Sequence, residues 1–185
     1  MSNEIDHFVG EIYNAVRNAF LDLFKNRERY YYCVLLTTGE AHPPYISAWS
    51  WEALARESEK MSSQENTIKE QMNLLKYSYA DSPYCLYGYD DYFNEVVEMF
   101  DERPAMDFND EGGWNIEFNF RYNAMVSAIK MLDDEGLFSL NQTRSKLLLN
   151  VEVMDESDVL LVNNAKLFNN SEAAINDYAN WCAQA

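Results

Sequence analysis

Cys85 and His42 are the two residues whose types could supply a nucleophile and a base. Both fall in turn-rich stretches, SPYCLYG and TGEAHPP. A cysteine nucleophile needs a neighbouring base that takes its proton and a further group that orients that base. Nothing in the spacing of the two residues supports such a pairing, and free cysteine is among the most buried residue types. We therefore expect Cys85 to pack among tyrosines, and we expect no catalytic residues.

Metal and cofactor signatures are weak in this sequence. The 3 cysteines and 2 histidines stand too far apart for a zinc site of the usual kinds. Asp107, Asn109 and Glu111 would occupy the first, third and fifth positions of an EF-hand calcium loop, but the twelfth position is Phe118 where that loop needs a glutamate. The sequence has no Gly-rich dinucleotide or phosphate loop, no G-x-S-x-G and no H-E-x-x-H. We expect no metal and no cofactor.

One acidic pattern carries an energetic cost. Asp91, Glu95, Glu98 and Glu102 recur at spacings of four, three and four before Pro104, which places them on one side of a helix. Like charges so placed destabilise a helix by about 0.2–0.5 kcal/mol per pair, and acids at its C-terminal end oppose the helix dipole. Further acids follow directly. The predicted partner-binding surface consists of Asp91, Glu95, Glu98, Glu102, Asp107, Asp110 and Glu111.

The helices that would position these residues follow from hydrophobic spacing. Ile5, Phe8, Ile12, Val16 and Phe20 recur every three or four residues, which predicts a long first helix. Ser50 can cap a second helix, and Gly136 ends the one with the longest apolar stripe. We expect helices over about 4–25, 51–60, 68–75, 93–103, 118–135, 157–168 and 174–182.

Three segments have the composition of strands. The run 30–37, YYYCVLLT, predicts a buried strand, and a short strand over about 45–49 should pair with it across a turn. Alternation along 147–153 predicts a half-buried strand. The strands are not regularly interleaved with the helices, which favours an α+β fold over a doubly wound sheet. We expect one compact domain over residues 1–185, with a small antiparallel-rich sheet and several packed helices.

The charge restricts the classes of partner. The chain of 185 residues has 14 Lys and Arg against 31 Asp and Glu, a net charge of −17. Nucleic acids and anionic membranes attract positive surfaces, so neither is expected as a partner, whereas a basic protein is the complementary prediction. A solubilising role of the charge is the alternative. An odd number of cysteines, no apparent leader and no long apolar run favour the cytoplasm.

Several segments resemble a known family. The order YYYCVLLTTGE, KYSYADSPYCLYG, YDDYFNEVVEMF, EGLFSLNQTRSKLLLNVEVMDESD and AKLFN resembles the bacterial family catalogued as domain of unknown function 4303. This resemblance covers most of the chain and implies a compact bacterial cytoplasmic protein. Families of this type often occur among the immunity proteins of toxin systems. The resemblance supplies no functional residues.

Three hypotheses follow. The leading one is a non-catalytic immunity protein that neutralises a cognate bacterial toxin, such as a basic nuclease, by covering its active site with an acidic face. The second is an acidic interaction or regulatory module with a non-toxin protein partner. The third is an enzyme with an unfamiliar site near Cys85 and His42.

Overall fold

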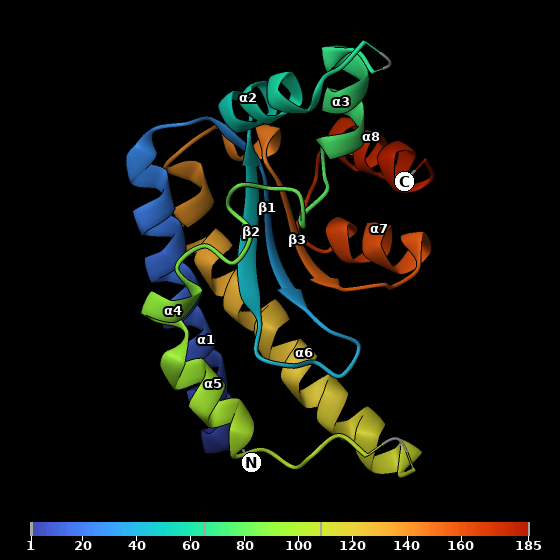
Figure 1. Cartoon of the computed structure of the whole chain (residues 1–185). Helices are drawn as coiled ribbons and strands as arrows, with labels where there is room; N and C mark the ends of the chain where they lie inside the picture. Colours follow the sequence, from blue (N-terminus) through green and yellow to red (C-terminus); the bar gives the residue numbers. More distant parts are fainter. Residues whose placement is uncertain (1, 65, 108, 185) are drawn as a thin grey trace.

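The computed structural model describes residues 2–64, 66–107 and 109–184. Its centre is a three-stranded sheet of order β2-β1-β3 (Figure 1). The strands are β1 (Tyr30–Thr37), β2 (Tyr45–Ser50) and β3 (Leu148–Val153). The α-helices are α1 (Ser2–Leu23), α2 (Trp51–Met61), α3 (Ile68–Leu75), α4 (Tyr89–Tyr92), α5 (Asn94–Asp101), α6 (Glu111–Asp134), α7 (Asp158–Lys166) and α8 (Glu172–Cys182). The predicted α+β class is confirmed.

The sheet is mixed. β1 runs antiparallel to β2, with Cys33 opposite Ala48, and parallel to β3, with Cys33 opposite Leu149. A parallel pair requires a long crossover, and here the crossover is the chain from β2 to β3 with five of the helices. The sheet is therefore one antiparallel and one parallel pair.

One face of the sheet is covered by α1, α5 and α6 (Figure 1). The apolar stripe of α1 lies in this core, where Ile12, Val16 and Phe20 have no exposed surface. Ala124, Ala128 and other small or apolar residues of α6 pack beside it, which lets the two long helices approach closely. Alternate strand residues such as Cys33 and Leu35 complete this core.

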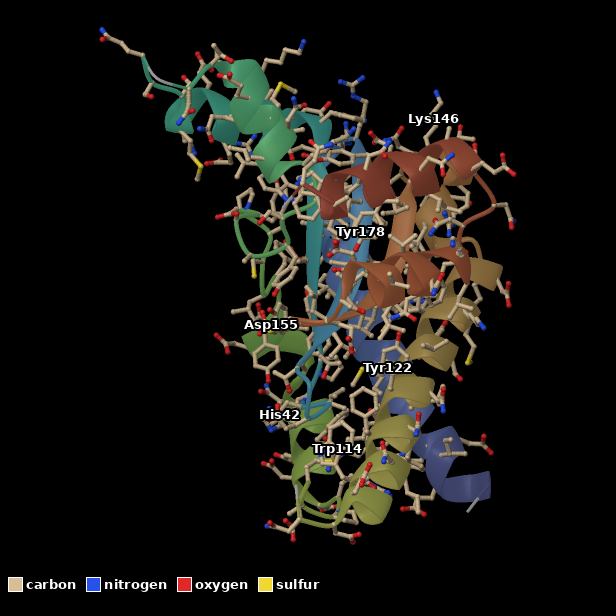
Figure 2. The ribbon with its side chains drawn as sticks, turned by 90° about the vertical axis from the view of Figure 1, so that its right-hand side faces the viewer. His42, Trp114, Tyr122, Lys146, Asp155 and Tyr178 are labelled. Carbon is tan, nitrogen blue, oxygen red and sulfur yellow. The ribbon has the colours of Figure 1, made fainter. Side chains whose placement is uncertain are left out.

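The opposite face is covered by α2, α3, α7 and α8. Tyr32, Val34 and Trp49 point to this side, because successive side chains of a strand alternate between faces. The side chain of Tyr178 on α8 lies between α8 and the sheet (Figure 2). Because helices cover both faces, all eight residues of β1 are buried.

Two expectations about individual elements are wrong. The strand β3 is buried on both faces, not half-buried, because α7 and α8 cover the side on which Asn150 and Glu152 lie. The stripe of Asp91, Glu95, Glu98 and Glu102 does not lie on one helix, because Phe93 leaves the helical conformation (φ −104°, ψ 5°) between α4 and α5. Asp91 therefore belongs to a different helix from Glu95.

Side chains occupy the outer edge of β3. The amide of Asn169 accepts a hydrogen bond from the backbone N–H of Leu149 (3.0 Å) and donates one to the Leu149 carbonyl (2.7 Å). The hydroxyl of Tyr122 donates to the carbonyl of Val151 (3.3 Å), whose N–H donates to the Asn150 side chain (3.0 Å). These contacts replace the neighbouring strand that β3 lacks on this side.

Helix ends follow local sequence signals. The side chain of Ser50 accepts a hydrogen bond from Ala53 N–H at the start of α2, as expected. Thr67 and Glu70 form a reciprocal capping box at the start of α3. Gly136, with φ of 80°, follows the end of α6 in the left-handed conformation that favours glycine. Within the described residues, none of the helices combines the length and apolar character needed to cross a membrane.

Candidate functional site

A groove of about 550 Å³ lies along the first half of α1 and α5 and is lined by both helices. Its lining carries five carboxylates and one guanidinium, so the groove has a strongly negative potential. Phe8 and Met99 contribute apolar surface. We call this hollow the acidic groove; its charged and titratable lining residues are Glu4, His7, Glu11, Glu95, Glu98, Glu102 and Arg103.

The α1 wall of the acidic groove comes from the helix period. Glu4 and Glu11 lie seven residues apart, two turns along one side of α1. His7 lies between them, with its Nδ1 3.8 Å from a carboxylate oxygen of Glu11. Phe8 and Ile12 face the core, so the polar residues are turned toward the groove and solvent.

The α5 wall contains three residues of the predicted acidic surface. Val96 and Phe100 are buried in the core that α1 shares, whereas Glu95 and Glu98 are exposed and line the groove. Glu102 follows at the C-terminal end of α5. The predicted stripe thus lies beside α1, and α1 supplies carboxylates that the sequence pattern of α5 alone did not indicate.

Arg103 joins the helices that border the groove. Its guanidinium donates to both carboxylate oxygens of Glu117 on α6 (2.9 and 2.6 Å), pairs with Glu4 on α1, and lies 4.0 Å from the Phe120 ring centroid. These hydrogen bonds to Glu117 raise the pKa of Arg103. Arg121, 4% exposed, donates to the same Glu117 carboxylate (2.7 Å). The buried cluster fixes the relative positions of α1, α5 and α6.

The ionisation of Glu117 agrees with this arrangement. Burial alone would raise the pKa of Glu117, but hydrogen bonds from Arg103 and Arg121 outweigh burial and hold that pKa below its ordinary value. The carboxylate is therefore charged at neutral pH. A charged Glu117 offsets one of the two positive charges of Arg103 and Arg121, and Arg103 also pairs with Glu4 of the groove.

A second hollow of about 440 Å³ lies on the other side of Arg103. Glu40, His42 and Asp101 line it together with Arg121. The last backbone carbonyls of α5 add partial negative charge here, because a helix C-terminus carries the negative end of the helix dipole. Acidic groups therefore surround the C-terminal end of α5 on both sides.

The other four predicted surface residues lie outside the lining of the acidic groove. Asp91 is exposed on α4. Asp107 accepts hydrogen bonds from the backbone and side chain of Asn109, and Asp110 caps α6 by accepting from Gly113 N–H (3.0 Å). Glu111 occupies the first turn of α6, where a negative charge favours the helix dipole. The hydrogen bonds of Asp107 and Asp110 within their own segment are sufficient to account for these two acidic residues without a partner.

Cys85 and His42 have different surroundings. The Cys85 thiol lies beside the Tyr45 hydroxyl, and burial raises the pKa of Cys85, which opposes thiolate formation. His42 is exposed and lines the second hollow together with Arg103. The structure therefore gives Cys85 a tyrosine neighbour and a buried position that disfavours the thiolate on which the third hypothesis depends.

Cation binding by the carboxylates is a separate question. Among residues 2–64, 66–107 and 109–184, no group of three His, Cys, Asp or Glu side chains could hold a metal ion. The glutamates of the acidic groove are among these residues, so no three of them are arranged to hold a single ion. This geometry fits a partner with several positive charges better than a single ion.

Comparison with known proteins gives one match. The model of the family described as "Domain of unknown function (DUF4303)" matches residues 12–170. No curated protein and no solved structure matches the chain. The matched range contains all three strands and α5, while Glu4, His7 and Glu11 of the acidic groove precede it. The resemblance noted from the sequence is thereby confirmed.

Proposed function

This chain belongs to the family of the domain of unknown function DUF4303, and we propose that it is a non-catalytic immunity protein that binds a basic domain of a cognate bacterial toxin. The observation that carries this proposal is the acidic groove between α1 and α5. Its five glutamates would face the cationic surface with which a nuclease holds its polyanionic substrate. A bound immunity protein would exclude that substrate.

The charge distribution supports a protein partner over other classes. Five carboxylates over an apolar floor of Phe8 and Met99 match a segment in which lysine or arginine side chains alternate with apolar ones. The net charge of −17 adds long-range attraction for a basic partner and raises the association rate. The same field repels nucleic acids and anionic lipid surfaces.

A non-toxin partner is the second candidate. It would use the same acidic groove, so substitutions in the groove do not discriminate between the two. The discriminating property is toxicity of the partner. A partner that arrests growth when expressed alone, and not when expressed with this chain, supports the immunity role.

The first test combines capture with neutralised groove residues. We expect the tagged chain to capture a basic partner from a lysate of its native cells at low salt and to release it at high salt. The triple variant Glu95→Gln, Glu98→Gln, Glu102→Gln should lower affinity for the purified partner by about tenfold or more, because each lost ion pair contributes up to about 1 kcal/mol. Binding is measured by calorimetry.

A matched control carries the same change in net charge elsewhere. Glu59, Asp134 and Glu172 are exposed on α2, α6 and α8, outside the lining of the acidic groove. Their replacement by Gln, Asn and Gln should leave the affinity within about twofold. Equal losses in both triple variants would show that only total charge matters, and the groove would then be rejected as the binding site. A captured partner that is harmless to cells would reject the immunity role.

A further inference from the structure

Three aromatic rings meet where α2, α3 and α8 approach the upper end of the sheet (Figure 1). The ring of Tyr31 stacks on Trp51, with centroids 4.1 Å apart, and Tyr77 stands edge-on to Tyr31 at 5.8 Å. Trp51 remains 38% exposed although it takes part in this stack. Aromatic faces carry negative potential, so such a group attracts organic cations.

A cation of the chain itself already occupies this aromatic group. The Lys76 ammonium lies 5.9 Å from the Trp51 ring centroid and 5.5 Å from that of Tyr77. It also pairs with Oδ2 of Asp177 at 2.5 Å, and the Tyr77 hydroxyl donates to the same oxygen at 2.7 Å. We call Tyr31, Trp51, Tyr77 and Asp177 the aromatic cage. Its chemistry is that of an ammonium site, and Lys76 is the internal occupant.

A cavity of about 330 Å³ adjoins the aromatic cage. All four cage residues line it, and so does Lys146. Ser145 and Ser171 also line it and are shared with a further hollow of about 460 Å³. The cavity therefore contains a carboxylate and π faces together with an exposed ammonium and hydroxyl groups. Figure 2 shows Lys146 near the top of the molecule and His42 in its lower half.

We propose that this cavity binds a small zwitterion with a quaternary ammonium group, of the betaine type. The ammonium group replaces that of Lys76 in the aromatic cage, beside Asp177. The anionic group of the ligand meets Lys146 and the serine hydroxyls. Because such a ligand has no net charge, the field of the protein does not repel it. This inference is independent of the proposed function, since it concerns other elements.

Hydrogen bonds hold the backbone around Lys76 in place. The ligand would therefore displace only the side chain of Lys76 from the aromatic cage. The Tyr31 hydroxyl donates to the Lys76 carbonyl (2.5 Å), and the indole N–H of Trp181 donates to the carbonyl of Leu74 (3.1 Å). The C-terminal end of α3 is thereby held against α8 and β1. The long side chain of Lys76 can rotate outward without moving this backbone. Competition with Lys76 should weaken ligand binding in the native chain.

The test is a calorimetric titration of glycine betaine into the whole chain and its variants. Lys76→Ala empties the aromatic cage and should bind betaine about tenfold more tightly than the native chain. Adding Trp51→Ala to Lys76→Ala should abolish binding, because one π face is removed. Trp51 is partly exposed, so the double variant should fold, and circular dichroism checks this. Absence of saturable binding to Lys76→Ala would overturn the proposal.

Two further ligands separate the contributions of charge. 3,3-Dimethylbutanol has the shape of choline without its charge, and we expect it not to bind; binding equal to that of choline would overturn the cation site. Lys146→Ala in the Lys76→Ala background should weaken betaine about tenfold and leave choline unchanged. If the affinity for betaine and for choline both stay the same, or both fall equally, Lys146 does not bind the anionic group of the ligand.

Discussion

At the scale of single residues, the most unusual group is Glu152. Its side chain is 3% exposed, and one oxygen, Oε1, accepts hydrogen bonds from three donors. These are the hydroxyls of Tyr32 (2.7 Å) and Tyr178 (2.6 Å) and the amide of Asn150 (2.9 Å). Burial raises the pKa of Glu152, and the three hydrogen bonds lower it only in part. The residue thus joins β3 to β1 and α8 at an energetic cost that depends on pH.

The pH dependence has a definite sign. In the unfolded chain Glu152 ionises near its ordinary pKa, while the folded chain retains the proton to higher pH. The stabilisation from this group is present below the unfolded pKa and is lost as the pH rises through the folded pKa. We expect Glu152→Gln to remove this loss. Urea unfolding at several pH values from about 4.5 upward measures it as the difference between native and variant stability.

Glu152→Ala is the companion variant. It leaves three buried donors without their acceptor, at about 1–3 kcal/mol for each unsatisfied group. We expect a large loss of stability at every pH, in contrast with Glu152→Gln, which keeps an acceptor oxygen in place. An unchanged pH profile in Glu152→Gln would contradict a raised pKa as the origin of the dependence.

Sequence reasoning found part of the acidic groove. The spacing of Glu95, Glu98 and Glu102 marked one side of a helix, because three- and four-residue spacings are local. Glu4 and Glu11 lie seven residues apart on one side of α1, but their position opposite α5 depends on tertiary packing that no local pattern specifies. The buried role of Glu152 was missed because polar and apolar residues alternate along β3. The same alternation occurs in a strand that has one face in water.

At the scale of elements, Asn169 is one of the side chains that occupy the outer edge of β3. Asn169 bonds both backbone groups of Leu149 and also donates to the Ala165 carbonyl (2.6 Å). It therefore ties the end of α7 to the strand and closes the edge at the same residue. An open edge strand is a template for pairing with another chain.

Asn169→Ala should have two effects. It leaves the buried backbone groups of Leu149 unpaired, which should lower the free energy of unfolding by about 1–3 kcal/mol. It also exposes the edge, so the variant should self-associate as concentration rises. Urea unfolding and sedimentation velocity measure the two effects. Asn170→Ala, at the exposed neighbouring position, is the control. A monomeric Asn169→Ala with native stability would contradict this role.

Most elements could be predicted from the sequence because their signals are local. The ranges of β1 and α3 agree with expectation, and the Ser50 cap and the glycine after α6 mark their helix ends correctly. The division between α4 and α5 was missed because phenylalanine is compatible with a helix. Phe93 has a non-helical backbone conformation, and its side chain packs in the core. The parallel partner of β1 was also missed, because register between distant strands has no local signature.

At the scale of the whole molecule, charge opposes compactness. A net charge of −17 on 185 residues places many carboxylates near one another, and their mutual repulsion is partly relieved on unfolding. Several ion pairs such as Arg29–Glu52 lie at the surface, where each contributes little. Repulsion among the excess acids should therefore dominate the response of stability to salt.

Salt should stabilise this protein. Raising the ionic strength from about 0.01 M to about 0.1 M shortens the screening length from about 30 Å to about 10 Å. We expect the melting temperature to rise, by about 2–4 °C for each kcal/mol of repulsion that is screened. Scanning calorimetry measures this. The groove variant with Glu95, Glu98 and Glu102 replaced by Gln should melt higher at low salt and respond less. A melting temperature that falls with salt would contradict the dominance of repulsion.

The pairing of β1 with β3 has a consequence for biosynthesis. Tyr32 lies beside Leu148, so the central strand acquires its parallel neighbour only after the intervening helices have left the ribosome. The hairpin of β1 and β2 is synthesised early, after α1, which covers one of its faces. The other face, rich in tyrosine and tryptophan, is fully covered only after α7 and α8 have been synthesised. During translation, this uncovered face is where a chaperone would be expected to bind the nascent chain.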